Sequence, residues 1–296
     1  MEKVLAPTNI PVFFIKADCL PQAWEEAVLA VWDKGLEIKT QYDKPEDPPS
    51  KDATVMISVA RPFDEPRIHK NLPGGPVELE SYCQEVLKGI HDDWVDPAGG
   101  KWTYTYHQRL FDYCGVKDTS DTAGRKNFRA VDQIQYIIDT LSDTGHTRRA
   151  QAITWIPETD AGASHPPCLQ RIWCRLTSDE TGRLALNMNT HWRSRDLYKA
   201  WFMNAYAFTL LQKMIAEGIS DKIGRPVQIG RYLDISDSLH IYGSYSAEVR
   251  AEVKKMRRGD FRNRSWQSTH PAFVMMTEEA RENLKKNPDF YAKPQQ

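Results

Sequence analysis

The stretch of residues 196–218, DLYKAWFMNAYAFTLLQKMIAEG, constrains the fold of this chain more than any other segment. Apolar residues occur all around its helical projection, which predicts a long and mostly buried helix. Directly before it, two β-rich segments within 168–194 are joined by a Ser-Asp-Glu-Thr-Gly turn and predict a β-hairpin. A buried helix beside a hairpin indicates a sheet that is covered by helices.

The rest of the chain mixes strand and helix patterns without a strict βαβ order. Strands are expected at 10–16, 53–61, 148–156 and twice within 225–243, and helices at 20–35, 77–90 and 127–142. This mixture favours an α+β fold, a large twisted mixed sheet packed by helices. No internal repeat and no break in composition marks a second domain. We therefore expect a single domain over 1–296, with its core at about 53–246 and an extension at each end.

Charge and composition exclude several classes of function. The formal net charge is −1, from 39 basic and 40 acidic residues, whereas proteins that coat nucleic acid or membranes carry a basic excess. No apolar run approaches the roughly 18 residues that span a bilayer, and the N-terminus lacks a signal-peptide pattern. The five cysteines form no CxxC pair and the eight histidines are scattered. We expect a cytoplasmic protein with no metal site, no nucleic-acid partner and no membrane partner.

Four short segments in the second half concentrate reactive and anion-binding groups. They are Arg148-Arg149, Pro166-Pro167-Cys168, Arg193-Ser194-Arg195-Asp196 and His240-Ile241-Tyr242. Each has an ordinary structural interpretation when it is taken alone: a solvated strand edge, a packed small thiol, a surface ion pair and a core pair on one strand face. Only their combination points to a function.

In this order and at this spacing, the four segments resemble the thymidylate synthase family. The resemblance covers roughly residues 78–245 and rests on TGHTRRAQAITW, PPC, WRSRDLYKAWFMNAY and SLHIYGSY. The sequences PCLQ and SLHIY are most similar to the divergent archaeal-type branch and to pyrimidine nucleotide hydroxymethylases. The resemblance implies a thymidylate-synthase-like fold and an enzyme that uses 5,10-methylenetetrahydrofolate to transfer a one-carbon unit to C5 of a pyrimidine nucleoside 5′-monophosphate.

The same resemblance implies that Cys168 is the nucleophile. Addition of a thiolate at C6 turns C5 into an enolate carbon that can attack an iminium. A thiol with a pKa of about 8.5 is only partly ionised at neutral pH, and a neighbouring Arg lowers that pKa. The family pattern gives this place to Arg193. Tyr104 is the candidate for proton transfer at C5, and Glu80 (or Glu78) is the candidate for the family's proton-shuttling glutamate.

The phosphate of the nucleotide requires several guanidinium groups and a hydroxyl. Arg193 and Ser194 would supply these within one subunit. The family pattern assigns Arg148 and Arg149 to the phosphate of the other subunit, which implies a homodimer with shared active sites.

Base and sugar contacts are implied for four further residues. His240 and Tyr242 lie two apart on a strand, so they point to the same face and would bind the sugar 3′-hydroxyl. Asp196 would contact the folate or the base, and Asn204 would read the pyrimidine edge. An amide can donate to O4 and accept from N3–H of uracil, whereas a cytosine-selective site is expected to carry Asp there. Asn204 therefore favours uracil.

The chain departs from the family pattern in ways that leave the product open. Leu169 replaces the His that usually follows the nucleophile, His91 replaces a Trp near the folate, and the C-terminus YAKPQQ lacks a small apolar tail. A closed, dry site favours hydride transfer and a 5-methyl product (dUMP to dTMP), whereas a wetter site lets water add and gives a 5-hydroxymethyl product on dUMP, dCMP or CMP. A further phosphate-binding Arg is expected from the N-terminal region, either Arg61 or Arg67.

Two other classes of function remain as alternatives. A catalytically silent nucleotide-binding or scaffold protein would keep the arginines without needing Cys168. A Cys-His hydrolase would pair Cys168 with His165 or His240, but the sequence shows no accompanying oxyanion-hole signature.

Overall fold

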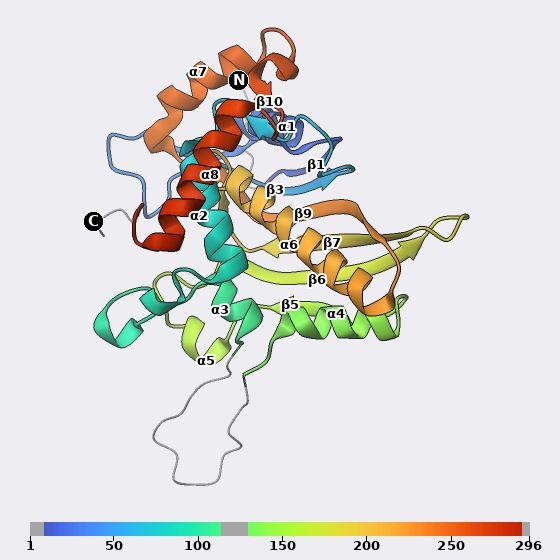
Figure 1. Ribbon diagram of the computed structural model, residues 1–296. Coiled ribbons are helices and arrows are strands. Elements are labelled where there is room, and N and C mark those ends of the chain that lie inside the picture. The colour runs from blue at the N-terminus through green and yellow to red at the C-terminus, as the bar shows by residue number, and fades with distance from the viewer. Residues whose placement is uncertain (1–8, 114–129, 292–296) are drawn as a thin grey trace.

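A computed structural model describes residues 9–113 and 130–291 of the chain. Its centre is a mixed sheet in the order β1-β3-β9-β7-β6-β5, extended by β2 beside β3 and β8 beside β9 (Figure 1). The strands are β1 Val12–Ala17, β2 Leu36–Ile38, β3 Ser50–Val59, β5 Gln151–Ile153, β6 Leu169–Ser178, β7 Leu184–Trp192, β8 Arg195–Asp196 and β9 Val227–Ile241. A separate two-stranded ladder pairs β4 Ile68–His69 with β10 Ser265–Trp266.

The sheet combines both strand directions. β1 runs parallel to β3, and β7 and β8 run parallel to β9, while the pairs β3–β9, β6–β7 and β5–β6 are antiparallel. This arrangement confirms the expected α+β class and mixed sheet. The hairpin β6–β7 also confirms the prediction from residues 168–194.

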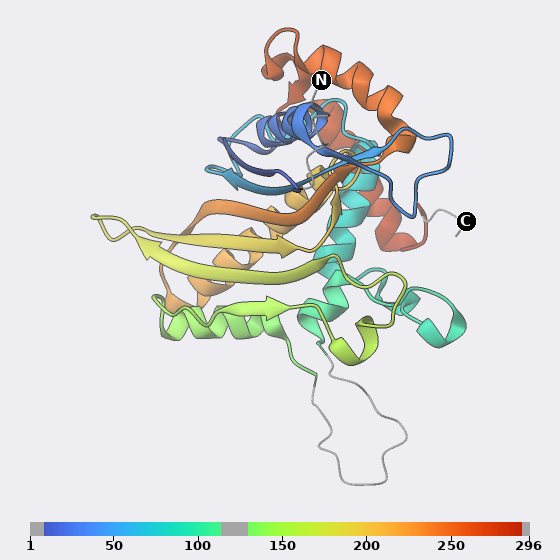
Figure 2. The same cartoon turned by 180° about the vertical axis from the view of Figure 1, so that it is seen from behind.

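One face of the sheet is covered by helices. The helices are α1 Leu20–Lys34, α2 Gly75–Lys88, α3 Tyr106–Phe111, α4 Gln133–Asp143, α5 Pro157–Asp160, α6 Trp201–Ile223, α7 Ser246–Met256 and α8 Pro271–Lys286, with short 3₁₀ turns at Asp92–Trp94, Pro97–Gly99, Gly243–Tyr245 and Phe261–Arg264. The long α6 lies across this face, and the reverse view shows the strands in front of it (Figure 2). Most residues of α6 are buried, among them Trp201, Phe208 and Ile215, while Lys213 and Glu217 are exposed.

The opposite face of the sheet carries a row of cross-strand partners. In register, this row consists of Phe14, Met56, Ile235, His191, Arg171 and Ile153. Phe14 is 57 %, Met56 38 % and Ile153 40 % exposed, so within the described residues no helix buries the apolar members of this row, which also contains His191 and Arg171. Such an open apolar face is typical of an interface between subunits.

Both ends of the chain join the core. Leu20, Trp24 and Val28 of α1 are fully buried, and the indole of Trp24 donates to the carbonyl of Leu197 at 3.0 Å. At the other end, α8 packs against α2 (Figure 1), with Phe273 buried. Segments outside the 53–246 range therefore contribute directly to the hydrophobic core.

Two elements differ from the sequence expectation. Residues 225–243 form one long strand, β9, because register shifts opposite β3 and β7 absorb the irregularities that suggested two strands. The helix expected from residue 196 begins at Trp201. Asp196 instead belongs to β8, and its carboxylate accepts from the backbone N–H groups of Tyr198 and Lys199 at 2.9 Å each, which makes a turn before the helix.

A buried ion pair anchors the C-terminal ladder to α1. Arg264 donates to both carboxylate oxygens of Glu25 at 2.7 Å, and His69 Nε2 lies 2.9 Å from the same carboxylate. Glu25 is 5 % and His69 1 % exposed. Burial raises the pKa of the Glu25 carboxyl, but the hydrogen bonds from Arg264 and His69 outweigh this and hold that pKa below its ordinary value.

We predict that Arg264→Ala destabilises the protein by about 2–3 kcal/mol, because it leaves the Glu25 carboxylate buried without its main partner. Since the pKa of Glu25 is lowered in the folded state, the wild-type stabilisation is present above the unfolded pKa and is lost as the pH falls through the folded pKa. Urea unfolding at pH 7 and at pH 3.5 measures both effects. A variant whose free energy of unfolding equals that of the wild type at pH 7 would contradict the prediction. Arg183→Ala, in the exposed β6–β7 turn, is the control.

Candidate active site

Cys168 lies immediately before β6, at the open end of the β6–β7 hairpin and opposite its turn. Its carbonyl accepts from the backbone N–H of Arg193 at 2.9 Å, which fixes the PPC segment against the end of β7. Burial raises the pKa of the Cys168 thiol, and the guanidinium groups of Arg193 and Arg195 act in the opposite direction. The half-buried thiol therefore lies within reach of two positive charges.

The side chain of Arg193 is held on the same segment. Its Nε donates to the Pro167 carbonyl at 3.0 Å and one terminal nitrogen donates to the Pro166 carbonyl at 2.6 Å. A guanidinium has five N–H donors, so these two bonds leave donors for an anion. Ser194, the next residue, lines a pocket that is described below. The sequence-predicted group Cys168, Arg193 and Ser194 is therefore assembled in one place.

Two tyrosines, Tyr104 and Tyr106, lie beside Cys168. Burial raises the pKa of Tyr104 to about 12, and its neighbours include Cys168 and Tyr106. The hydroxyl of Tyr106 accepts from the backbone N–H of Leu169 at 3.4 Å, and the Tyr104 and Tyr106 rings are 5.5 Å apart. Both phenols keep their protons at neutral pH, so they can donate hydrogen bonds in this site. Tyr104 therefore lies beside Cys168, and Tyr106 is an additional residue of this site that the sequence did not single out.

Asn204 reaches the site from the first turn of α6. It is 9 % exposed, and its Nδ2 donates to the hydroxyl of Tyr82 on α2 at 2.7 Å. Burial raises the pKa of Tyr82 well above its ordinary value, so this hydroxyl is neutral and can accept or donate. Tyr82 was not among the residues singled out from the sequence. The periodicity of the α2 sequence does not distinguish Tyr82 from an ordinary aromatic residue of the core.

A polar pocket of about 140 Å³ lies at the ends of β3 and β9. His240, Tyr242 and Ser238 line it from β9 and the residue after it, and Asp52 lines it from β3. The segment between β2 and β3 closes the pocket, with Tyr42 packed edge-on against the Tyr242 ring at 5.9 Å. This segment lies so close to the end of β9 that a Cβ on Gly243 would lie 1.7 Å from the carbonyl oxygen of Pro48. His240, Tyr242 and Ser194 thus line one pocket.

Asp196 is engaged by the protein itself. Besides the turn at the start of α6, its second carboxylate oxygen accepts a short hydrogen bond from the Tyr245 hydroxyl. Tyr245 packs against Tyr242, with ring centroids 5.9 Å apart. Asp196 does not line the pocket itself but is linked through Tyr245 to Tyr242, and its contacts to Tyr198, Lys199 and Tyr245 fix its orientation.

Other predicted residues lie elsewhere. Glu80 faces α8, where Arg281 donates to it at 2.8 and 3.1 Å, and not the residues around Cys168. Arg148 and Arg149 are exposed before β5, as expected for groups that reach another subunit, and the described chain gives them no contact with Cys168. Glu78 lies in the first turn of α2.

Neither N-terminal arginine lies in the pocket. Arg61 is exposed and pairs with Asp18 and Asp64. Arg67 is buried, with its guanidinium carbon 4.0 Å from the Phe63 ring centroid. The N-terminal segment that does reach the pocket contains Thr40 and Tyr42 instead.

Aromatic side chains surround the position at which the sequence departs from the family. His91 stacks on Trp94 with ring centroids 3.9 Å apart, and Trp102 packs edge-on against Trp94 at 4.9 Å. Burial lowers the pKa of His91, but the hydrogen bonds that its ring donates to Glu85 and to the Pro288 carbonyl outweigh this and raise that pKa. The His thus preserves an aromatic stack and adds a group that can be charged.

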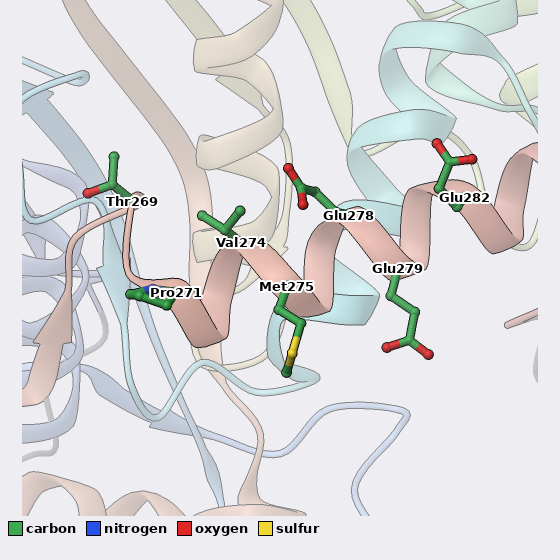
Figure 3. A pocket seen from close by; sticks show the side chains of 7 residues that line it. All are labelled: Thr269, Pro271, Val274, Met275, Glu278, Glu279 and Glu282. Carbon is green, nitrogen blue, oxygen red and sulfur yellow. The ribbon is translucent and has the colours of Figure 1, made fainter.

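A pocket of about 530 Å³ lies on the outer surface of α8 (Figure 3). It is lined by glutamates, apolar groups and Thr269, and no cysteine, histidine or arginine is among its lining residues. This pocket therefore has none of the chemistry of the Cys168 site. Among the described residues no group of His, Cys, Asp and Glu could hold a metal ion, and no helix is long and apolar enough to cross a membrane.

Comparisons with known proteins bear on the family and the fold of this chain. The putative thymidylate synthase of Methanosarcina mazei is 26 % identical over 230 residues, which cover 77 % of this chain and 88 % of that protein. The one from Methanocaldococcus jannaschii is 28 % identical over 233 residues, covering 77 % and 90 %. The thermostable thymidylate synthase A from Bacillus subtilis shares the fold with a TM-score of 0.57 and 14 % identity, covering 83 % of this chain and 91 % of that one.

The family model described as thymidylate synthase matches residues 81–279. This range contains Cys168, Arg193, Asn204 and His240, and it extends through most of α8. The resemblance that the four motifs suggested is therefore confirmed, and so is the expectation of an enzyme of this type. This chain belongs to the thymidylate synthase family.

Proposed function

We propose that this protein transfers a one-carbon unit from 5,10-methylenetetrahydrofolate to C5 of a pyrimidine nucleoside 5′-monophosphate, with the Cys168 thiolate adding to C6. The observation that carries the proposal is the position of Cys168. Its thiol lies beside Arg193, at the end of the hairpin next to the pocket of Ser194, His240 and Tyr242. A silent binding protein would need the arginine and the pocket but not the cysteine, and a Cys-His hydrolase would leave Arg193 without a role.

Each residue has a part in this mechanism. Arg193 would bind the phosphate and favour the thiolate, and the thiolate would form a covalent bond to C6. Asn204, oriented by Tyr82, would read the pyrimidine edge. The Tyr104 hydroxyl, which stays protonated, would transfer protons at C5, directly or through water.

The folate fits the aromatic character of the site. Tyr104, Tyr106 and Tyr242 lie near Cys168, so a flat heterocycle bound here would have aromatic neighbours. When bound, this group supplies a one-carbon unit at the oxidation level of formaldehyde, with or without a hydride. Leu169 is fully buried, so the position after the nucleophile is apolar rather than polar. Four described cysteines are free thiols: Cys19, Cys83, Cys168 and Cys174. Free thiols are typical of the reducing cytoplasm, where the nucleotide and the folate also occur, and this supports a cytoplasmic location.

The uncovered sheet face supports a homodimer with shared active sites. Phe14, Met56 and Ile153 would be buried there, and Arg148 and Arg149 would reach the phosphate bound by the partner. Trp173, on the same face, donates to the Arg148 carbonyl at 3.0 Å and so links the arginine segment to this face.

The reaction is tested by mass spectrometry of the products formed from dUMP, dCMP, UMP and CMP with 5,10-methylenetetrahydrofolate. We expect dUMP to gain either a methyl group with dihydrofolate formed, or a hydroxymethyl group without folate oxidation. Cys168→Ser should lower turnover by roughly 10⁴-fold or more while nucleotide binding is retained. Cys174→Ser, at a buried cysteine of β6, is the matched control and should remain active. Full turnover by Cys168→Ser would reject the nucleophile, and no product from any nucleotide would favour a silent binder.

Arg193→Ala should weaken binding of dUMP by about 2 kcal/mol, roughly 30-fold, because a charge-assisted hydrogen bond to the phosphate is lost. Binding of deoxyuridine, which has no phosphate, should change much less. Calorimetric titration of both ligands measures the difference, and Arg183→Ala in the distant hairpin turn is the control. Equal losses for nucleotide and nucleoside would reject a phosphate role for Arg193.

The dimer is tested by subunit complementation. Cys168→Ser and Arg149→Ala should each be nearly inactive, and mixing them should restore activity, because a heterodimer then contains one site with both groups intact. Met56→Arg should shift the protein from dimer to monomer in sedimentation, since it places a charge in the apolar row. A wild-type monomer in sedimentation, or dimeric mixtures that recover no activity, would contradict shared sites.

A further inference from the structure

Three side chains from neighbouring strands form a chain of hydrogen bonds that leads to the polar pocket. The hydroxyl of Ser238 donates to Asp52 Oδ1 at 2.9 Å, and the same hydroxyl lies 3.4 Å from His240 Nδ1. Asp52 and His240 are direct partners in the antiparallel pairing of β3 with β9. Ser238 and His240 are two residues apart on β9, so their side chains share a face.

The number of available protons fixes the direction of each bond. A hydroxyl has one proton, and an ionised carboxylate can only accept, so Ser238 donates to Asp52. The Ser238 hydroxyl has then used its only proton, so towards His240 it can only accept a hydrogen bond. His240 Nδ1 must therefore carry a proton and donate it to Ser238. In a neutral imidazole this leaves Nε2 without a proton, as an acceptor.

The other side of the His240 ring is consistent with this assignment. Nε2 is buried and has no hydrogen-bond partner among the described residues, and His240 is 7 % exposed. Burial lowers the pKa of His240 against the opposing effect of Asp196 and Asp52, so the ring is neutral at pH 7. A buried acceptor without a donor costs about 1–3 kcal/mol, which a ligand hydroxyl would offset.

We propose that Asp52 and Ser238 are positioning residues that hold His240 in its Nδ1–H tautomer, so that Nε2 accepts a hydrogen bond from a sugar hydroxyl of the substrate. The inference deepens the proposed function, because it rests on a nucleotide that binds in this pocket. It also defines the substrate more closely. The sugar must present a free hydroxyl that donates to Nε2, and a nucleotide without that hydroxyl leaves Nε2 unpaired.

A purely structural interpretation makes a different prediction. If Ser238 and Asp52 only strengthened the pairing of β3 with β9, replacing them would lower stability and leave the tautomer unchanged. A free histidine side chain slightly prefers the Nε2–H form. The chain of hydrogen bonds from His240 through Ser238 to Asp52, called the relay below, must therefore act against this intrinsic preference. The tautomer is therefore the readout that separates positioning from strand pairing.

Nitrogen-15 NMR of the full chain with labelled histidines tests the relay without any ligand. His240→Gln assigns the signal. We expect the Nδ1–H form of His240 in the wild type and a shift toward Nε2–H in Ser238→Ala and in Asp52→Ala. Ser238→Thr, which keeps the hydroxyl, should retain the Nδ1–H form. Asp237→Asn is the matched control, because it neighbours Ser238 but contacts His191 at 3.0 Å instead. An Nε2–H tautomer in the wild type, or no change in Ser238→Ala, would overturn the proposal.

Ligand binding tests the consequence for the substrate. The wild type should bind dUMP about 10-fold more tightly than 2′,3′-dideoxyuridine 5′-monophosphate, the size expected for one hydrogen bond to an otherwise unpaired buried group. Ser238→Ala should reduce this ratio toward one, and Ser238→Thr should preserve it. A ratio that Ser238→Ala leaves unchanged would overturn the link between relay and sugar. If neither nucleotide binds the wild type, the proposed function fails, while the tautomer measurement still decides the relay.

Discussion

One buried carboxylate, Asp234, organises the part of the structure on which the site depends. It is fully buried in β9 and receives a short ion-pair contact from Arg195 of β8 and a hydrogen bond from the Trp201 indole at 3.2 Å. The hydroxyls of Tyr232, Thr190 and Ser236 donate to it at 3.1, 3.3 and 3.2 Å. These donors come from β7, β8, β9 and α6, so a single charge joins the four elements on which or beside which Arg193, Asn204 and His240 lie.

The anchoring of Arg195 explains the geometry of its neighbours. The Arg195 guanidinium carbon lies 3.8 Å from the Trp192 ring centroid, and the residue is buried. Because its side chain is directed into the core, Arg195 fixes the backbone between β7 and α6. Arg193 and Ser194 then face Cys168 and the pocket, while Asp196 caps the turn before α6. Because the Asp234 carboxylate would be costly without its donors, this region has little freedom to rearrange. Because the region around Asp234 is rigid, the active-site side chains need only a few hydrogen bonds each to keep their positions.

The sequence predicted those parts of the site that are local. Cys168, Arg193, Ser194, His240 and Tyr242 lie in short motifs, and strand alternation places the last two on one face. The hairpin and α6 were predictable because their apolar periodicity is strong.

Residues whose role depends on distant pairing could not be found in this way. Asp52 reaches His240 only through the register of β3 with β9, and Tyr82 meets Asn204 only because α2 packs against α6. Glu80 illustrates the reverse case. Its position on α2 suggested a catalytic carboxylate, but it faces Arg281, whose segment of the chain had no predicted structure. Pairings over such distances leave no periodic signal in a single sequence.

The electrostatics of Cys168 link the phosphate site to the nucleophile. Burial is the largest influence on this thiol and favours the neutral form, while Arg193 and Arg195 favour the thiolate. Arg195 is already paired with Asp234, so Arg193 carries the less compensated charge. Two of its donors bind the carbonyls of Pro166 and Pro167, which hold the guanidinium next to the thiol without neutralising it. The same guanidinium can then bind a phosphate and support a thiolate, because carbonyl groups fix its position and leave its charge available to both.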